Sequence, residues 1–147
     1  MKKRTAVVLS VLLLLLPVLF GCSKTEESTD AFQVKTGETF SVTVAMENSG
    51  AVKSMALTLY FDENAFELVD GAWLAENGII ADFNRENKDA AIAFEEETEL
   101  QGEVFEFQLT AKKDLTIIDD IIVVEPILKN GRDSIVCKGL TLLYSKS

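Results

Sequence analysis

The chain has 147 residues, a formal net charge of −10 and no histidine. The acidity argues against a nucleic-acid partner, because contacts to phosphate dominate the affinity of such complexes. The absence of histidine excludes Ser-His and Cys-His catalytic pairs, and a zinc site would have to use cysteine or carboxylate ligands alone. A pair of carboxylates, as in glycosidases, stays possible, and residues 95–99 supply several. An acidic run at a strand end is usually a solvated loop, so we predict a non-catalytic protein without a metal or cofactor.

The first 21 residues have the pattern of a bacterial export signal. Three basic residues at 2–4 precede an apolar run over 6–20, which is shorter than the roughly 20 residues that cross a bilayer as a helix. Leu19-Phe20-Gly21-Cys22 then fits the lipobox, in which a small residue precedes a cysteine that is acylated. We predict a signal peptide over 1–21 and a lipid on Cys22. The alternatives are an ordinary secretory signal and an uncleaved anchor.

Residues 22–30 and 31–147 differ in composition. Positions 23–30 hold no hydrophobic residue, so we predict that 22–30 form the lipidated cysteine and a flexible tether. Loss of the signal peptide changes the formal charge from −10 to −13. Anionic headgroups repel such a chain, so the lipid has to hold it at the outer face of a bacterial membrane. Residues 31–147 suffice for one core and therefore one domain.

Most of the predicted domain alternates hydrophobic residues with polar or small ones, which is typical of β-strands. Two long alternating runs cover 40–46 and 55–61, with the turn Asn48-Ser49-Gly50 between them. Further strands are predicted over 66–69, 79–83, 90–94, from 102 onward, over 117–124 and over 135–144. No stretch of helical length has a 3.6-residue period, although 71–77 has room for one helical turn. The sequence predicts an all-β fold, a single β-sandwich of about eight or nine strands with jelly-roll-like topology.

Three segments of this layout resemble the cohesin family. Residues 37–44 (GETFSVTV) look like the family's opening turn and second strand. Residues 57–62 (LTLYFD), followed by 66–69 (FELV), are similar to the strand that ends in Tyr-Asp and to its return strand. Residues 102–109 (GEVFEFQL) resemble the later strand that starts with glycine. The resemblance extends over nearly the whole predicted domain and implies a cohesin-like sandwich.

The resemblance also implies a partner and a place for it. Cohesins are sandwich modules that bind dockerins in cellulose-degrading assemblies, and the partner docks on the outer face of one sheet. The strands here over 54–61, 79–84 and 90–95 resemble strands of that sheet. With their hydrophobic residues inward, the residues that face the partner are Ala56, Thr58, Tyr60, Asp82, Asn84, Ala91, Ala93 and Glu95. The small side chains leave a flat surface that a helix can approach, and Tyr60 offers an anchor with a polar tip.

The alternative function is that of a carbohydrate-binding or structural surface lipoprotein with the same fold and no dockerin recognition. Flat sandwiches usually bind sugars through a row of aromatic rings. This chain has one tryptophan, Trp73, and two tyrosines, Tyr60 and Tyr144, and no three-ring platform is apparent in the sequence. A protein partner is therefore favoured, and a polysaccharide ligand stays open.

Two further features concern metal and cysteine chemistry. The side chains at 62–64, at 119–120 and in the acidic run 95–99 offer oxygen ligands of the kind that calcium prefers, but their spacing matches no defined loop such as the EF-hand. Scattered surface charge is therefore favoured over a metal site. With Cys22 lipidated, Cys137 has no partner for an internal disulfide. We predict that Cys137 is a buried, inert thiol in a strand.

Overall fold

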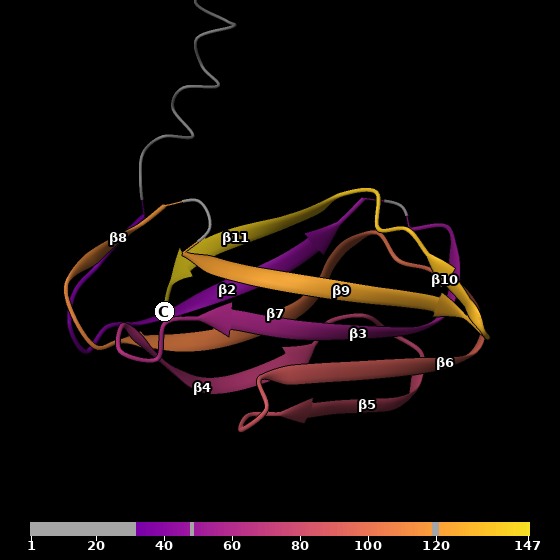
Figure 1. The fold of residues 1–147 in the computed structure, drawn as a ribbon, viewed down its shortest axis with the longest axis horizontal. Coiled ribbons are helices and arrows are strands. Elements are labelled where there is room, and N and C mark those ends of the chain that lie inside the picture. Colours follow the sequence, from indigo (N-terminus) through magenta and orange to yellow (C-terminus); the bar gives the residue numbers. More distant parts are fainter. Residues whose placement is uncertain (1–31, 48, 119–120) are drawn as a thin grey trace, which may run out of the picture. The chain divides into compact units, whose positions relative to one another are not determined.

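The computed structural model describes residues 32–47, 49–118 and 121–147 (Figure 1). The predicted signal peptide, tether and lipidation site lie outside these residues. The described residues form eleven strands: β1 Phe32–Val34, β2 Thr39–Met46, β3 Ala51–Phe61, β4 Phe66–Trp73, β5 Gly78–Asn84, β6 Asp89–Glu99, β7 Gly102–Ala111, β8 Leu115–Ile117, β9 Ile122–Asn130, β10 Asp133–Ile135 and β11 Leu140–Lys146. No helix in the part of the chain that the structure describes is long and apolar enough to cross a membrane.

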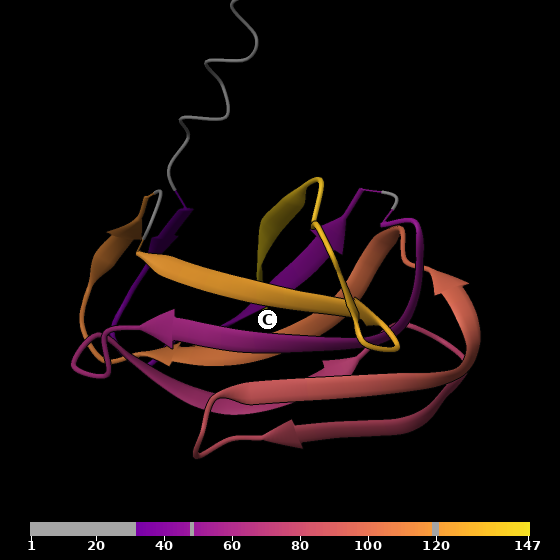
Figure 2. The same cartoon turned by 45° about the vertical axis from the view of Figure 1, so that its right-hand side comes forward.

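The strands form two main sheets that pack face to face. One has the order β10-β9-β3-β6-β5 and the other β11-β2-β7-β4, and β1 pairs with β8 in a small sheet at one end. Figure 2 shows the two layers, with β9, β3, β6 and β5 in front. The strand pairs are antiparallel in each sheet. The predicted all-β sandwich is confirmed.

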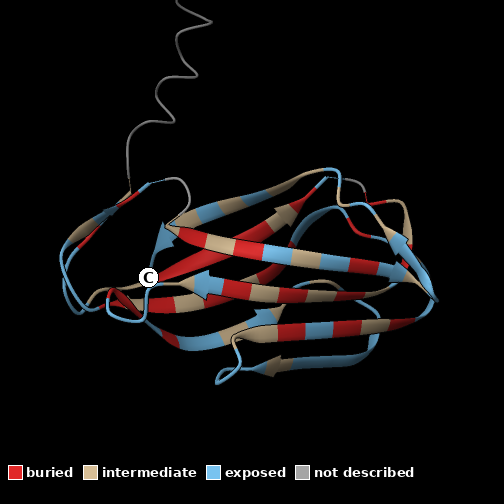
Figure 3. Cartoon of the chain, viewed as in Figure 1, coloured by how far each residue is buried: buried red, intermediate tan, exposed pale blue. Residues whose placement is uncertain are grey.

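The core lies between the two sheets and consists of the inward residues of the alternating strands. Burial alternates along β3 and β9 (Figure 3), and the five-residue run from Ser54 to Thr58 shows it well, with Met55 and Leu57 buried. The largest fully buried side chains include Phe40, Phe66, Phe105, Phe107, Met55, Leu57, Leu59, Leu109 and Leu128. Burial of each such side chain stabilises the fold by roughly 1.5–3 kcal/mol. The inward faces predicted for the two long alternating runs are therefore confirmed.

An aromatic cluster closes the sandwich where β4 meets β5. The Phe105 ring centroid lies 5.0 Å from that of Trp73 and 5.8 Å from that of Phe83. The indole Nε1–H of Trp73 donates a hydrogen bond of 3.0 Å to the carbonyl oxygen of Asp82 on β5. Trp73 therefore links the edge strands of the two sheets, and it holds β5 in place. The helical turn considered over 71–77 is not formed, because β4 extends to Trp73.

Two of the predicted strands are each divided in the structure. The run over 117–124 is split between β8, which ends at Ile117, and β9, which begins at Ile122. The run over 135–144 is split between β10, which ends at Ile135, and β11, which begins at Leu140. In each case the two pieces pair in different sheets, so the chain must leave one sheet to reach the next. Alternation of side chains does not encode this change of partner.

Candidate functional site on the five-stranded sheet

The outward side chains of β9, β3, β6 and β5 lie in rows across the five-stranded sheet. The antiparallel register places residues of neighbouring strands directly opposite one another. Written from β9 to β5, the three rows are Lys129-Ser54-Ala93-Ile80, Ile127-Ala56-Ala91-Asp82 and Glu125-Thr58-Asp89-Asn84. We call the surface made by these rows and by Tyr60 the outer face.

The structure brings all the predicted partner-facing residues except Glu95 onto this outer face. Ala56, Ala91 and Asp82 share the middle row, and Ala93 lies in the row beside it. Tyr60 extends the face along β3, where it lies opposite Val123 of β9 and is 49% exposed. The remaining two predicted positions, Thr58 and Asn84, share the third row.

Glu95 is exposed but lies beyond the regular rows. The register of β3 and β6 shifts between Val52 and Ser54, and the last regular pair before the shift is Ser54 with Ala93. Glu95 falls in the irregular stretch that follows. A bulge of this kind changes the direction of the side chains that come after it. Glu95 is therefore at the margin of the outer face and not part of its rows.

An open hollow of about 350 Å³ lies in the middle of the outer face. Its floor is made by the small side chains of the two central strands: Ser54, Ala56, Ala91 and Ala93. Its walls come from the flanking strands, with Ile80 of β5 on one side and Ile127 and Lys129 of β9 on the other. Ile80 is 57% exposed and Ile127 is 54% exposed. The face is thus concave and apolar at its centre, and not merely flat as the sequence predicted.

The walls of the hollow are the part that the sequence prediction missed. The strand expected to end at 124 continues as β9 to Asn130, so that Ile127 and Lys129 point outward while Leu128 is buried. Pro126 within it is tolerated because β10 pairs only with the last three residues of β9, so that Pro126 has a neighbouring strand on the β3 side alone. The period of two in the sequence continues past Pro126, and this pattern could have predicted that the strand extends beyond residue 124.

Tyr60 is coupled to Glu125 on the neighbouring strand. Glu125 faces Thr58, the residue two before Tyr60 on the same side of β3. The negative charge of Glu125 raises the pKa of the Tyr60 hydroxyl, and partial desolvation raises it further. The tyrosine is therefore a neutral hydrogen-bonding group at the polar end of the outer face.

The described residues do not present a row of exposed aromatic rings. Tyr60 is the aromatic member among their exposed large hydrophobic side chains. Trp73 is half-buried, packs edge-on against Phe105 and uses its indole N–H for Asp82. Nor do the described residues hold a group of three or more acidic, cysteine or histidine side chains that could bind a metal ion.

Cys137 differs from its predicted setting. The residue is half-buried and lies in the connection between β10 and β11, not in a strand. The prediction of a buried strand cysteine is therefore wrong. The reason is that the chain crosses between the sheets at this point, which also leaves the preceding Val136 81% exposed.

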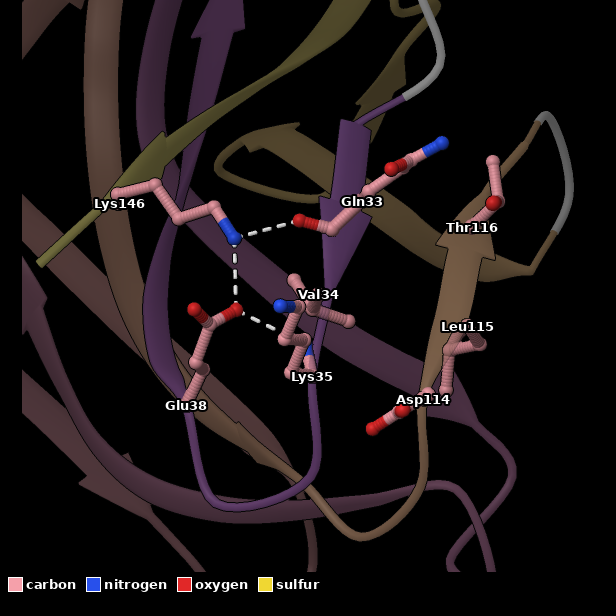
Figure 4. A pocket seen from close by; sticks show the side chains of 8 residues that line it. All are labelled: Gln33, Val34, Lys35, Glu38, Asp114, Leu115, Thr116 and Lys146. Carbon is pink, nitrogen blue, oxygen red and sulfur yellow. Dashed lines mark hydrogen bonds and ion pairs between the residues drawn. The ribbon is translucent and has the colours of Figure 1, made fainter.

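A second cavity, of about 500 Å³, lies at the end of the domain near β1 and β8. Figure 4 shows that Lys146 of β11, one of the two lysines that line it, is already engaged. Lys146 donates to the backbone carbonyl of Gln33 and to the carboxylate of Glu38, at 2.7 Å in the latter case. Opposite, Asp114 accepts hydrogen bonds from the backbone N–H and the hydroxyl of Thr36. These contacts engage Lys146, Glu38 and Asp114 within the domain.

Comparison with known families identifies the domain. A family model described as the cohesin domain matches residues 27–134, which is more than half of the chain. The chain belongs to the cohesin family. The resemblance seen in the strand motifs is confirmed, and the outer face can now be considered as a feature of a cohesin.

The fold is similar to that of a solved cohesin module. A cohesin module of a family 33 glycoside hydrolase from Clostridium perfringens superposes with a TM-score of 0.51 at 16% identity, covering 77% of this chain and 87% of that chain. A type I cohesin–dockerin complex from Clostridium thermocellum gives a TM-score of 0.49 at 14% identity, covering 76% and 86%. At these identities the likeness concerns the fold alone. A search of curated proteins gives no match.

Proposed function

We propose that this cohesin is a non-catalytic docking module that binds a dockerin-type protein on the outer face of its five-stranded sheet. Membership of the cohesin family supports the class of partner. The observation that supports this binding place is the apolar hollow, which has a floor of small side chains between the exposed Ile80 and Ile127. The predicted lipid on Cys22 would hold the bound partner at the cell surface, in a setting of polysaccharide degradation.

The energetics of the hollow favour association with another protein. Ile80 and Ile127 each expose more than half of their surface, so covering them contributes on the order of 1 kcal/mol apiece. The alanines of the floor lose no side-chain entropy on binding and let a partner backbone approach closely. An exposed apolar patch rimmed by polar groups is a common mark of a protein interface. Asp82, Thr58 and Tyr60 provide such a rim here.

The test is a direct measurement of binding to a panel of recombinant dockerin modules, with the full chain in detergent micelles. We expect one or more dockerins to bind, and Ala91→Arg to weaken that binding by about thirtyfold or more, because a long charged side chain then fills the hollow. The matched control is Ala72→Arg, which places the same charge on an exposed alanine of β4 in the other sheet. Equal binding by the two variants would contradict the proposed face.

The carbohydrate-binding alternative makes a different prediction in the same assay. In that case no dockerin binds, while soluble polysaccharides retard the chain in affinity electrophoresis. Tyr60→Ala would then reduce retardation by sugar, since Tyr60 is the exposed aromatic ring of the outer face. That pair of results would replace the docking proposal.

A further inference from the structure

The sequence contains two Asn-Gly pairs, Asn77-Gly78 and Asn130-Gly131. Asparagine before glycine is prone to deamidation without an enzyme, because glycine has no side chain to hinder attack of its backbone nitrogen on the amide carbon of asparagine. The reaction requires the asparagine side chain to fold back onto its own backbone. The extent to which the fold prevents this movement differs between the two pairs.

Asn130 is held through both its backbone and its side chain. It is the last residue of β9, where it pairs with Asp133 of β10. Its amide nitrogen Nδ2 donates hydrogen bonds to Oε1 of Glu97 at 3.0 Å and to the carbonyl oxygen of Ala51 at 3.3 Å. Attack by the nitrogen of Gly131 would break both of these bonds. The fold therefore protects Asn130.

Asn77 has no comparable restraint. Its side chain is exposed and makes no hydrogen bond to another residue in the described part of the chain. In the connection between β4 and β5, the N–H groups of Leu74 and Ala75 both donate to the carbonyl of Val104. Among the described residues, Glu76 and Asn77 take part in no backbone hydrogen bond of this kind. The torsion angles of Asn77 can therefore change without loss of a hydrogen bond.

Packing requires glycine at the position after Asn77. A Cβ atom at Gly78 would lie 2.7 Å from both Cδ1 and Cγ1 of Ile92 on β6. Ile92 is buried in the core and does not move away freely. A bulkier residue that would slow the attack therefore does not fit at position 78, and the reactive pair is built into the start of β5.

We propose that Asn77 is a site of spontaneous covalent modification, at which the asparagine is converted to isoaspartate and aspartate. The backbone nitrogen of Gly78 bonds to Cγ of Asn77, the Cγ–Nδ2 bond breaks, and ammonia leaves with the proton of the Gly78 nitrogen. Water then opens the cyclic imide. Hydrolysis at the main-chain carbonyl of residue 77 gives isoaspartate, and hydrolysis at the side-chain carbonyl gives aspartate.

The modification changes the start of β5. Isoaspartate adds a carbon atom to the main chain just before Gly78, and both products place a negative charge beside Glu76. β5 is an edge strand that pairs with β6 (Figure 1), and its register already shifts between Gly78 and Ile80. The lengthened main chain therefore loosens the end of β5 that carries Ile80, a wall of the hollow.

The test is to age the full chain in detergent micelles at pH 8, natively and unfolded in urea. Mass spectrometry with electron-transfer fragmentation of proteolytic peptides locates each product and distinguishes isoaspartate from aspartate. In the native chain, Asn130 should react at least about tenfold more slowly than Asn77, because two hydrogen bonds must break first. In urea the two sites should react at similar rates. The matched control is Asn77→Gly, which cannot form the imide and suits the φ of 66° at this position.

Two results would overturn the proposal. One is a native chain that stays unmodified at Asn77 while the chain in urea reacts there, and the other is native reaction at Asn130 as fast as at Asn77. The effect on β5 is read from hydrogen exchange of its backbone amides, which should be faster in the aged parent than in aged Asn77→Gly. Equal exchange in the two aged samples would refute the loosening of β5.

Discussion

Lys146 near the end of the last strand is paired with Glu38 in the turn before β2, with 2.7 Å between Nζ and Oε2. The same carboxylate oxygen accepts the backbone N–H of Lys35 at 2.8 Å. The amine also lies 5.2 Å from the ring centroid of Phe32 and donates to the carbonyl of Gln33. One lysine thus connects β11 to β1 and to the turn that follows it.

This pair predicts an acid-dependent contribution to stability. The Lys146 ammonium, and then the Lys35 N–H, hold the pKa of Glu38 below its ordinary value of 4.5. A group whose pKa is lowered by folding stabilises the native state above its unfolded pKa, and this contribution is lost as the pH falls through the folded pKa. The melting temperature of the parent should therefore exceed that of Glu38→Gln at pH 6, and the gap should shrink below pH 4.5.

The control for the acid experiment is Glu67→Gln, an exposed carboxylate of β4 for which we expect no such gap. Thermal melts monitored by circular dichroism from pH 3 to pH 7 give the comparison. A gap between parent and Glu38→Gln that stays constant over this range would show that the ion pair does not act through its charge.

Gly71 on β4 is required by the packing of two phenylalanines. A Cβ atom at this position would lie 2.7 Å from Cζ of Phe105 and 2.9 Å from Cε2 of Phe83. Phe105 is fully buried against Trp73 and cannot move away freely. Gly71→Ala should lower the free energy of unfolding by about 1–3 kcal/mol in urea titrations. Ala72→Ser, at the next and exposed position, should have little effect, and comparable losses in both variants would refute the packing argument.

Tyr60→Ala should weaken binding of a dockerin without unfolding the domain. The side chain is 49% exposed and points away from the core, so its removal leaves no internal cavity. Truncation of a buried interface anchor commonly costs about 2 kcal/mol or more, which is roughly thirtyfold in affinity. Calorimetric titration gives the affinity, and a melting curve gives the stability. Undiminished binding would place the docking anchor elsewhere.

The domain should keep its stability without metal or disulfide. The described residues hold no group of three metal-ligating side chains, and Cys137 is a free thiol. Chelator and reductant should therefore change the melting temperature by no more than a degree or two. A drop of several degrees with chelator, reversed by added calcium, would reveal a metal site at the carboxylate clusters.

Cys22 should carry a lipid in the exported protein. Cys22→Ser removes the thiol that the lipobox supplies, so the variant should appear in the soluble fraction or remain unprocessed. Intact-mass analysis of the parent should show a diacylglyceryl addition on a chain that begins at Cys22. An unmodified chain that begins at another residue would contradict the prediction.

Several features of this protein are properties of the sequence itself. The period of two along β3 determines which side chains point into the core, because burial of one face fixes the alternation. The same rule identified Ala56, Ala91 and Asp82 as outward residues. The predicted lipobox is also a local pattern, because it consists of the four consecutive residues 19–22.

The tertiary structure decided which outward residues become neighbours. Strand pairing joins segments far apart in the chain, and alternation within one strand carries no information about its partner. For this reason the sequence did not show that Ile127 faces Ala56, or that Ile80 lies beside Ala93. Those pairings turn a surface that the sequence predicted to be flat into a hollow with apolar walls. The antiparallel register also aligns Glu125, Thr58 and Asp89 across three strands, and this places carboxylates at one end of the outer face.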